Sequence, residues 1–154
     1  MKRLLCLFLC VLLSVAALAS CGSKYPISLP ELNEKPGLSM EIVTMGSTGF
    51  QKTVTVRLTN GTEHTILYGM TYQLLRYDGA SWENATRTPS LGNRAYPPDA
   101  YVLKSGESKE VTFTLTSRYF VNRSTPYCLT MRFFEEKGKE EYDCAVLLEP
   151  GAWQ

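Results

Sequence analysis

The fold is decided by an alternating stretch, QKTVTVRLT, which occupies Gln51–Thr59. Its apolar residues Val54, Val56 and Leu58 stand at every second position, with threonine or arginine between them. Successive side chains of a strand point to opposite faces, so this pattern predicts a strand with one buried and one solvated face. The turn residues Asn-Gly-Thr follow directly at 60–62 and end the strand.

Short segments of β character lie on both sides of this stretch, and none of them predicts a helix. We expect strands over Leu38–Met45, Thr65–Tyr77, Ala100–Leu103, Lys109–Thr116, Tyr127–Phe134 and Glu140–Leu148, with a return strand at Trp82 after the Asp78-Gly79 turn. The proline-containing segment Thr86–Pro98 predicts a loop. Two packed sheets would bury the apolar faces, so the sequence predicts an all-β antiparallel β-sandwich of about seven strands.

Alternation also assigns the inward faces of two of these strands. In Thr65–Tyr77 the expected inward residues are Tyr68, Met70, Tyr72 and Leu74. In Lys109–Thr116 they are Val111, Phe113 and Leu115.

The N-terminus has the pattern of an export signal. Lys2 and Arg3 precede an apolar run, Leu4–Ala19, whose 16 residues are fewer than the roughly 20 that cross a bilayer as a helix. The run ends in Leu-Ala-Ser and then Cys21. This pattern resembles bacterial lipoprotein signals, which implies cleavage after residue 20, a diacylglyceryl group on Cys21 and attachment to the outer face of the cell membrane. The competing interpretation is an ordinary cleaved signal with an incidental cysteine.

Cleavage defines the expected domain organisation. Residues 1–20 would be the signal peptide, 21–37 an extended, semi-flexible tether with three prolines, and 38–150 the sandwich domain. Without Lys2 and Arg3, 14 of the 16 basic residues remain against 15 acidic residues, a net charge of −1 with the histidine neutral. This balance gives no basic face, and we therefore expect no nucleic-acid partner.

The mature chain would keep two further cysteines, Cys128 and Cys144, in a compartment where disulfides persist. A two-residue turn at Lys137-Gly138 pairs Met131 with Cys144 and puts the two cysteines on opposite faces, where they cannot bond. A three-residue turn with a bulge at Gly138 makes them diagonal neighbours, near the limit of about 7 Å between Cα atoms for a disulfide. The compartment favours a disulfide and the apolar pattern argues against one, so both alternatives stay open.

The order of these elements resembles a known family. It runs from the Asn-Gly-Thr turn at 60–62 through Tyr72-Gln73-Leu74 and Asp78-Gly79 to the turn Leu103-Lys104-Ser105-Gly106-Glu107-Ser108, with Tyr127 opening a later strand. The pattern is similar to the bacterial immunoglobulin-like (Ig-like) domain of secreted and lipid-anchored proteins in Gram-positive bacteria, over about residues 40–134. The resemblance implies a seven-stranded sandwich without catalysis, and it supplies no binding residues.

The inventory of reactive side chains agrees with a non-enzymatic protein. His64 is the one histidine, beside a turn, and Glu63 next to it would face the opposite way. We expect a solvated histidine, no catalytic residues, no metal site and no cofactor. The acidic residues that flank the last turn, among them Glu135 and Glu140, are expected to be solvated.

Aromatic residues in and beside the loops offer a binding surface. The candidate partner-binding residues are Arg94, Tyr96, Tyr101, Tyr119 and Phe120. Exposed aromatic rings stack on sugars or anchor a protein partner, although for any one ring packing in the core is the competing interpretation. The expected function is binding or scaffolding at the cell envelope, with a protein or glycan partner. The alternative is a carbohydrate- or small-ligand-binding surface lipoprotein that uses these aromatics.

Overall fold

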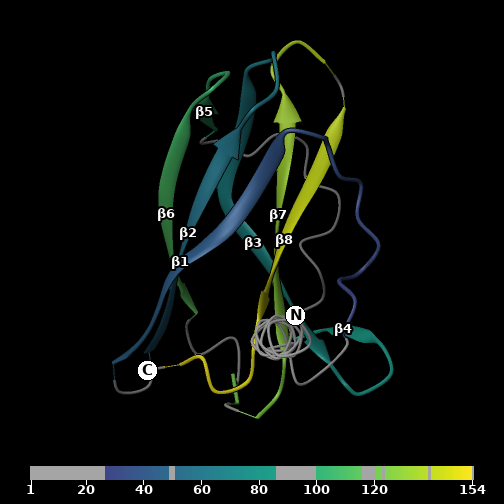
Figure 1. The fold of residues 1–154 in the computed structure, drawn as a ribbon, viewed down its shortest axis with the longest axis vertical. Coiled ribbons are helices and arrows are strands. Elements are labelled where there is room, and N and C mark those ends of the chain that lie inside the picture. The colour runs from purple at the N-terminus through teal and green to yellow at the C-terminus, as the bar shows by residue number, and fades with distance from the viewer. Residues whose placement is uncertain are drawn as a thin grey trace, which may run out of the picture.

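Two antiparallel sheets face one another in a sandwich (Figure 1). The computed structural model describes residues 27–48, 51–85, 100–115, 121–122, 124–138 and 140–153. The first sheet has the order β1-β2-β6, with β1 (Leu38–Thr48), β2 (Gln51–Asn60) and β6 (Ser108–Leu115). The second has the order β4-β3-β7-β8, with β3 (Ile66–Tyr77), β4 (Trp82–Asn84), β7 (Tyr127–Glu135) and β8 (Glu141–Leu148). The short strand β5 (Tyr101–Leu103) also pairs with β3, at the end away from β4. The predicted all-β sandwich is confirmed, with eight described strands where about seven were expected.

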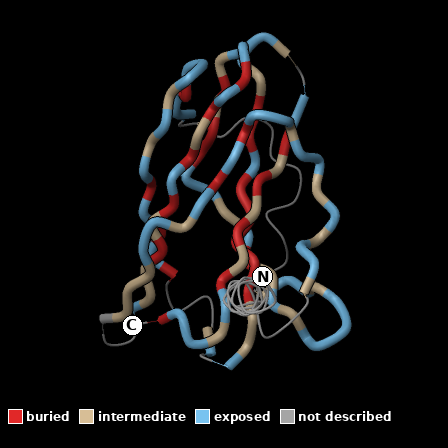
Figure 2. Tube along the Cα trace, viewed as in Figure 1, coloured by how far each residue is buried: buried red, intermediate tan, exposed pale blue. Residues whose placement is uncertain are grey.

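The alternating stretch forms the centre of the first sheet, as its pattern predicts. Val54, Val56 and Leu58 of β2 are fully buried, and β6 lies beside them with Val56 opposite Val111 and Val54 opposite Phe113. Figure 2 shows the buried residues along the strands of the two sheets, with exposed turns at both ends. Burial of these side chains stabilises the sandwich by roughly 1.5–3 kcal/mol each, the ordinary range for Val, Leu and Phe.

The β7–β8 hairpin has the register of the two-residue turn, with Met131 opposite Cys144. Cys144 therefore faces the core, and its thiol donates to the Leu38 carbonyl oxygen at 3.9 Å. Cys128, opposite Leu147, points to the other face of the same sheet. Both thiols are buried and free, so the disulfide that the compartment favoured is not formed. Burial raises the pKa of each thiol to about 12, which keeps the reactive thiolate scarce.

The expected inward face of β3 is wrong at one residue. Tyr68 and Leu74 are buried and Tyr72 packs against the core, but Met70 is exposed. The reason is an irregularity in the pairing of β3 with β7: Tyr68 lies opposite Phe133 and Tyr72 opposite Met131. Between these two pairs β3 has three residues and β7 has one. The extra residues of β3 form a bulge, and the alternation of inward and outward side chains is interrupted there.

Residues on both sides of the predicted domain, 38–150, also contact the sandwich. Residues 27–37, predicted as tether, run along the outer edge of β8 in Figure 1, where the Asp143 N–H donates to the Asn33 carbonyl oxygen at 2.9 Å. The Asn33 side chain donates to the Glu141 carbonyl oxygen at 2.5 Å. At the other end, Trp153 is buried in the core, beyond the predicted boundary at residue 150. This N-terminal strap, residues 27–37, covers an edge strand that would otherwise expose unpaired backbone groups.

Candidate functional site

The structure describes one of the five residues of the predicted binding surface, Tyr101. Tyr101 lies on β5 with 48% of its surface exposed, and its ring stacks on Tyr68 with 5.6 Å between ring centroids. Its neighbour Val102 is also exposed, and the Val102 carbonyl oxygen accepts a hydrogen bond from Lys109 Nζ at 2.8 Å. Tyr101 is thus a half-exposed ring held by a buried one. The other predicted residues, Arg94, Tyr96, Tyr119 and Phe120, and the lipid attachment residue Cys21 lie outside the described residues.

The Asn-Gly-Thr turn after β2 is organised by a buried side chain. The Asn60 amide donates to the carbonyl oxygens of His64 at 2.8 Å and Leu103 at 2.9 Å. Its oxygen accepts from the Thr62 backbone N–H at 3.0 Å and from the Thr62 hydroxyl at 2.7 Å. Asn60 therefore joins two turns that are 43 residues apart in the sequence.

The second of these turns is Lys104–Ser108, which belongs to the Leu103–Ser108 stretch of the sequence pattern. The Gly106 N–H donates to the Asn60 carbonyl oxygen at 2.7 Å, and Gly106 has a φ of 74°, a left-handed conformation that favours glycine. The Glu107 carboxylate accepts from the Lys104 backbone N–H at 2.8 Å, which contributes most to lowering the pKa of Glu107. This motif therefore stabilises one end of the sandwich rather than forming a reactive site.

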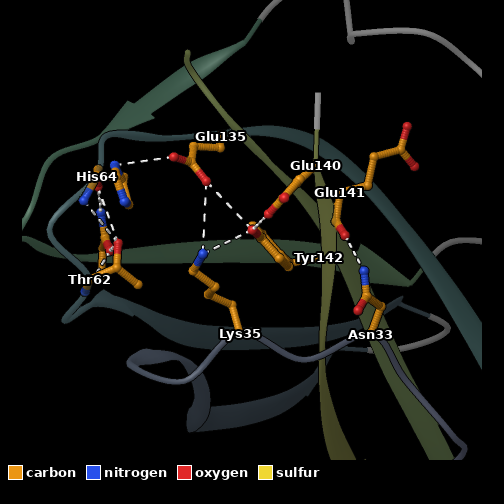
Figure 3. A network of polar contacts seen from close by, with 9 residues as sticks. Asn33, Lys35, Thr62, His64, Glu135, Glu140, Glu141 and Tyr142 are labelled. Atoms are coloured by element: carbon orange, nitrogen blue, oxygen red, sulfur yellow. Dashed lines mark hydrogen bonds and ion pairs between the residues drawn. The ribbon is translucent and has the colours of Figure 1, made fainter. Parts of the chain in front are cut away.

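A polar cluster lies at the same end, and we call it the Glu135 cluster: Lys35, His64, Glu135, Glu140 and Tyr142 (Figure 3). The Glu135 carboxylate, only 14% exposed, lies 3.1 Å from His64 Nδ1 and 3.8 Å from Lys35 Nζ. Lys35 Nζ donates to the Tyr142 hydroxyl at 2.9 Å, and that hydroxyl donates in turn to the Glu140 carboxylate. The cluster thus ties the N-terminal strap and the β2–β3 loop to the β7–β8 hairpin.

The electrostatics of the cluster follow from these contacts. The hydrogen bond with Tyr142, together with the nearby carboxylates, raises the pKa of Lys35 and keeps its ammonium charged. The hydrogen bond to the Glu140 carboxylate raises the pKa of Tyr142 and keeps its hydroxyl protonated. Both groups are therefore held in their ordinary ionisation states, which suits a structural link.

The sequence interpretation of this cluster was wrong about Glu135 and incomplete about His64. Glu135 was expected to be solvated, yet it is largely covered and paired. His64 is exposed over 56% of its side chain, as expected, but it also pairs with Glu135. Alternation along β7 could have predicted that Glu135 is covered. Glu135 lies on the same face of the strand as the inward residues Met131 and Phe133.

A second group of contacts lies at the other end of the sandwich, around the β3–β4 hairpin. The Trp82 indole N–H donates to the Ser28 carbonyl oxygen at 2.9 Å, and the Trp82 and Tyr77 rings pack with centroids 5.3 Å apart. In the turn, the Asp78 carboxylate accepts from the backbone N–H groups of Ser81 and Ala80, both at 2.8 Å. These two bonds lower the pKa of Asp78, with Ser81 contributing most. The hairpin thereby holds the start of the described chain.

Within the described ranges, no group of three or more potential metal ligands comes together, and no helix has the length and apolar character to cross a membrane.

The comparison with family models decides the family. The model described as "Bacterial Ig-like domain" matches residues 34–125, more than half of the chain. The chain belongs to this family. Bacterial Ig-like domains are generally non-catalytic, and the family suggests a binding or scaffolding module. The match begins at residue 34, inside the strap that the sequence interpretation had assigned to a tether.

Other comparisons add little to the Ig-like assignment. A target of the Northeast Structural Genomics Consortium is 12% identical with a TM-score of 0.41, over 73% of this chain and 83% of that one. Bacteroides uniformis beta-glucuronidase 2 is 16% identical with a TM-score of 0.33, over 72% of this chain and 12% of that one. Neither distant likeness carries a functional argument. No curated protein matches the chain.

Proposed function

We propose that this Ig-like domain is a lipid-anchored module on the outer face of the cell membrane, and that it acts by binding or scaffolding at the cell envelope. The observation that carries the proposal is the Leu-Ala-Ser-Cys21 stretch, at the end of a short apolar run and ahead of a domain of this family. A diacyl anchor gives stable attachment where a single acyl chain gives only marginal binding.

The arrangement of the described contacts supports a structural module. The strap covers β8, and the Tyr72 hydroxyl donates to the Thr114 carbonyl oxygen of the edge strand β6 at 3.1 Å. Lys35 and Glu135 join the strap to the sandwich. These contacts hold the strap and the edge strand β6 to the rest of the domain, as expected for a spacer or for a scaffold that carries docking loops.

The experiment is a pull-down from detergent-solubilised envelope, with bound proteins identified by mass spectrometry. It compares the lipidated protein with Cys21→Ala, which removes the lipid attachment, and with Ser23→Ala as a matched control that keeps it. We expect an envelope protein to co-purify specifically with the native chain and with Ser23→Ala. Loss with Cys21→Ala indicates recognition near the bilayer, and retention indicates recognition by the sandwich. The absence of a specific partner from all three samples contradicts the proposal.

One observation favours a second candidate function, the binding of a carbohydrate or small ligand by loop aromatics. Tyr101 offers a half-exposed ring backed by Tyr68, the geometry that stacking on a sugar uses. Tyr101→Ala should abolish saturable binding on a glycan array. Val102→Ala, at the adjacent exposed residue, is the matched control and should preserve it. Equal binding by both variants excludes Tyr101 from the surface.

A further inference from the structure

The start of the described chain is fixed at one end of the sandwich. Trp82 holds Ser28 through the hydrogen bond to its carbonyl oxygen, 2.9 Å long. From Ser28 the strap runs along β8 to the opposite end, where β1 begins, as Figure 1 shows. The β3–β4 end is therefore the end at which the chain leaves toward its N-terminus.

The distance from this fixed point to Cys21 is limited by covalent geometry. Ser28 follows Cys21 by seven residues, and a chain spans at most about 3.5 Å per residue, which gives a reach of about 25 Å. The strand β3 alone has 12 residues. At about 3.3 Å per residue, it separates the two ends of the sandwich by roughly 35 Å. A lipid on Cys21 thus holds the β3–β4 end close to the membrane and leaves the far end free to point away.

The side chains of the near end suit a lipid surface. Leu29, directly after the fixed point, is 41% exposed, and Trp82 lies beside Tyr77 in the hairpin. Tryptophan and tyrosine gather at membrane–water interfaces because one part of each ring is apolar and another is polar.

Charge does not distinguish the two ends. The far end carries exposed glutamates such as Glu63 and Glu136, but exposed Lys137 lies in the same turn as Glu136. The near end carries exposed Asp78 and Glu83. Reach and aromatic content are therefore the observations that favour the orientation with the β3–β4 end toward the membrane.

We infer that the tip of the β3–β4 hairpin, together with Leu29, rests on the lipid surface, so that the Glu135 cluster and its acidic turns face outward. This inference rests on the proposed anchor at Cys21. It makes the outward end, with the Asn60 turn and the β7–β8 turn, the surface that a partner in the envelope can reach.

The test measures the depth of two labels in the lipidated full-length protein. Ala80→Cys and Lys137→Cys place an environment-sensitive fluorophore on exposed turns at the near and far ends. Cys128 and Cys144 are buried, so labelling of the folded protein is confined to the new thiols. The proteins are reconstituted into phosphatidylcholine–phosphatidylglycerol vesicles that carry a nitroxide on the lipid headgroup. We expect quenching at least threefold stronger at the Ala80 site than at the Lys137 site. Equal quenching, or stronger quenching at the Lys137 site, overturns the inference.

A second comparison tests contact rather than proximity. Leu29→Asp should reduce quenching of the label at the Ala80 site at least twofold. Val43→Asp is the matched control, because Val43 is a similarly exposed aliphatic residue on β1, and it should leave quenching unchanged. No effect of Leu29→Asp overturns the lipid contact. The lipid contact is also overturned if native envelope shields the Ala80 site from an aqueous quencher while pure lipid does not. That outcome would mean that a protein occupies this end.

Flotation of the vesicles separates failure of the inference from failure of the proposed function. A protein that floats and shows equal quenching at both sites is anchored but oriented differently. A protein that does not float, and whose mass shows no diacylglyceryl group, lacks the anchor, and then both proposals fall.

Discussion

Replacement of Asn60 by aspartate changes one buried atom and should destabilise the whole end of the sandwich. The Asn60 amide nitrogen donates to the His64 and Leu103 carbonyl oxygens, and the side chain is fully buried. A carboxylate cannot donate, so Asn60→Asp leaves the Leu103 carbonyl oxygen facing another oxygen, while the His64 carbonyl oxygen keeps a longer bond from the Thr62 hydroxyl at 3.3 Å. Each buried polar group left unsatisfied costs about 1–3 kcal/mol, and the buried charge adds to this. We therefore expect the free energy of unfolding to fall by about 4 kcal/mol, a large part of the 5–15 kcal/mol typical of a domain.

The assay is urea unfolding at neutral pH, followed by tryptophan fluorescence. Gln73→Glu makes the same amide-to-acid change at an exposed position of β3 and should shift the free energy of unfolding by less than about 0.5 kcal/mol. Lowering the pH should recover part of the loss in Asn60→Asp, because a protonated carboxyl group donates one hydrogen bond. A loss below about 1 kcal/mol, or one equal to that of Gln73→Glu, would refute the view that Asn60 joins the two turns.

Three further predictions follow from the contacts described above. Burial raises the pKa of the Cys128 and Cys144 thiols to about 12. Both thiols should therefore resist a thiol reagent at pH 8 in the folded protein and react fully in urea. Fast reaction of the native protein would contradict their burial. The pKa of Asp78 is lowered in the folded protein, so its stabilising effect is present above the ordinary pKa and is lost as the pH falls through the lowered value. Wild-type protein should accordingly lose more stability than Asp78→Asn between pH 5 and pH 2, and parallel acid titrations of the two would count against this role. Glu135→Gln should cost about 1 kcal/mol and speed hydrogen exchange at the Asp143 amide, which bonds the strap, whereas unchanged exchange would show that the strap does not depend on Glu135.

The strands could be predicted because their side chains obey a period of two. Val54, Val56 and Leu58 point inward in β2, as their alternation requires. The same rule supported the two-residue turn in the β7–β8 hairpin, and the observed pairing of Met131 with Cys144 agrees with it. In both places a change of register by one residue would expose an apolar face, so the sequence leaves little freedom.

The failures occur where long-range contacts override local pattern. The bulge in β3 exposes Met70 because the pairing with β7 shifts there, which alternation within one strand cannot reveal. Residues 21–37 were predicted to be an extended, semi-flexible tether from their prolines, but Asn33 and Lys35 bond to residues more than 100 positions away. Glu135 was predicted to be solvated because it flanks a turn, but it is the last residue of β7 and its carboxylate lies beside Lys35 and His64. In each case the deciding partner lies far away in the sequence.

The lipid on Cys21 holds the proposed module at the membrane, and the mass of the mature N-terminus tests for it directly. The protein is extracted from membranes of the producing bacterium, digested, and its N-terminal peptide analysed by mass spectrometry. We predict a peptide that begins at Cys21 and carries the mass of a diacylglyceryl group. A mature N-terminus at any other residue, or an unmodified Cys21, would contradict the central claim that this Ig-like domain is held on the membrane by lipid.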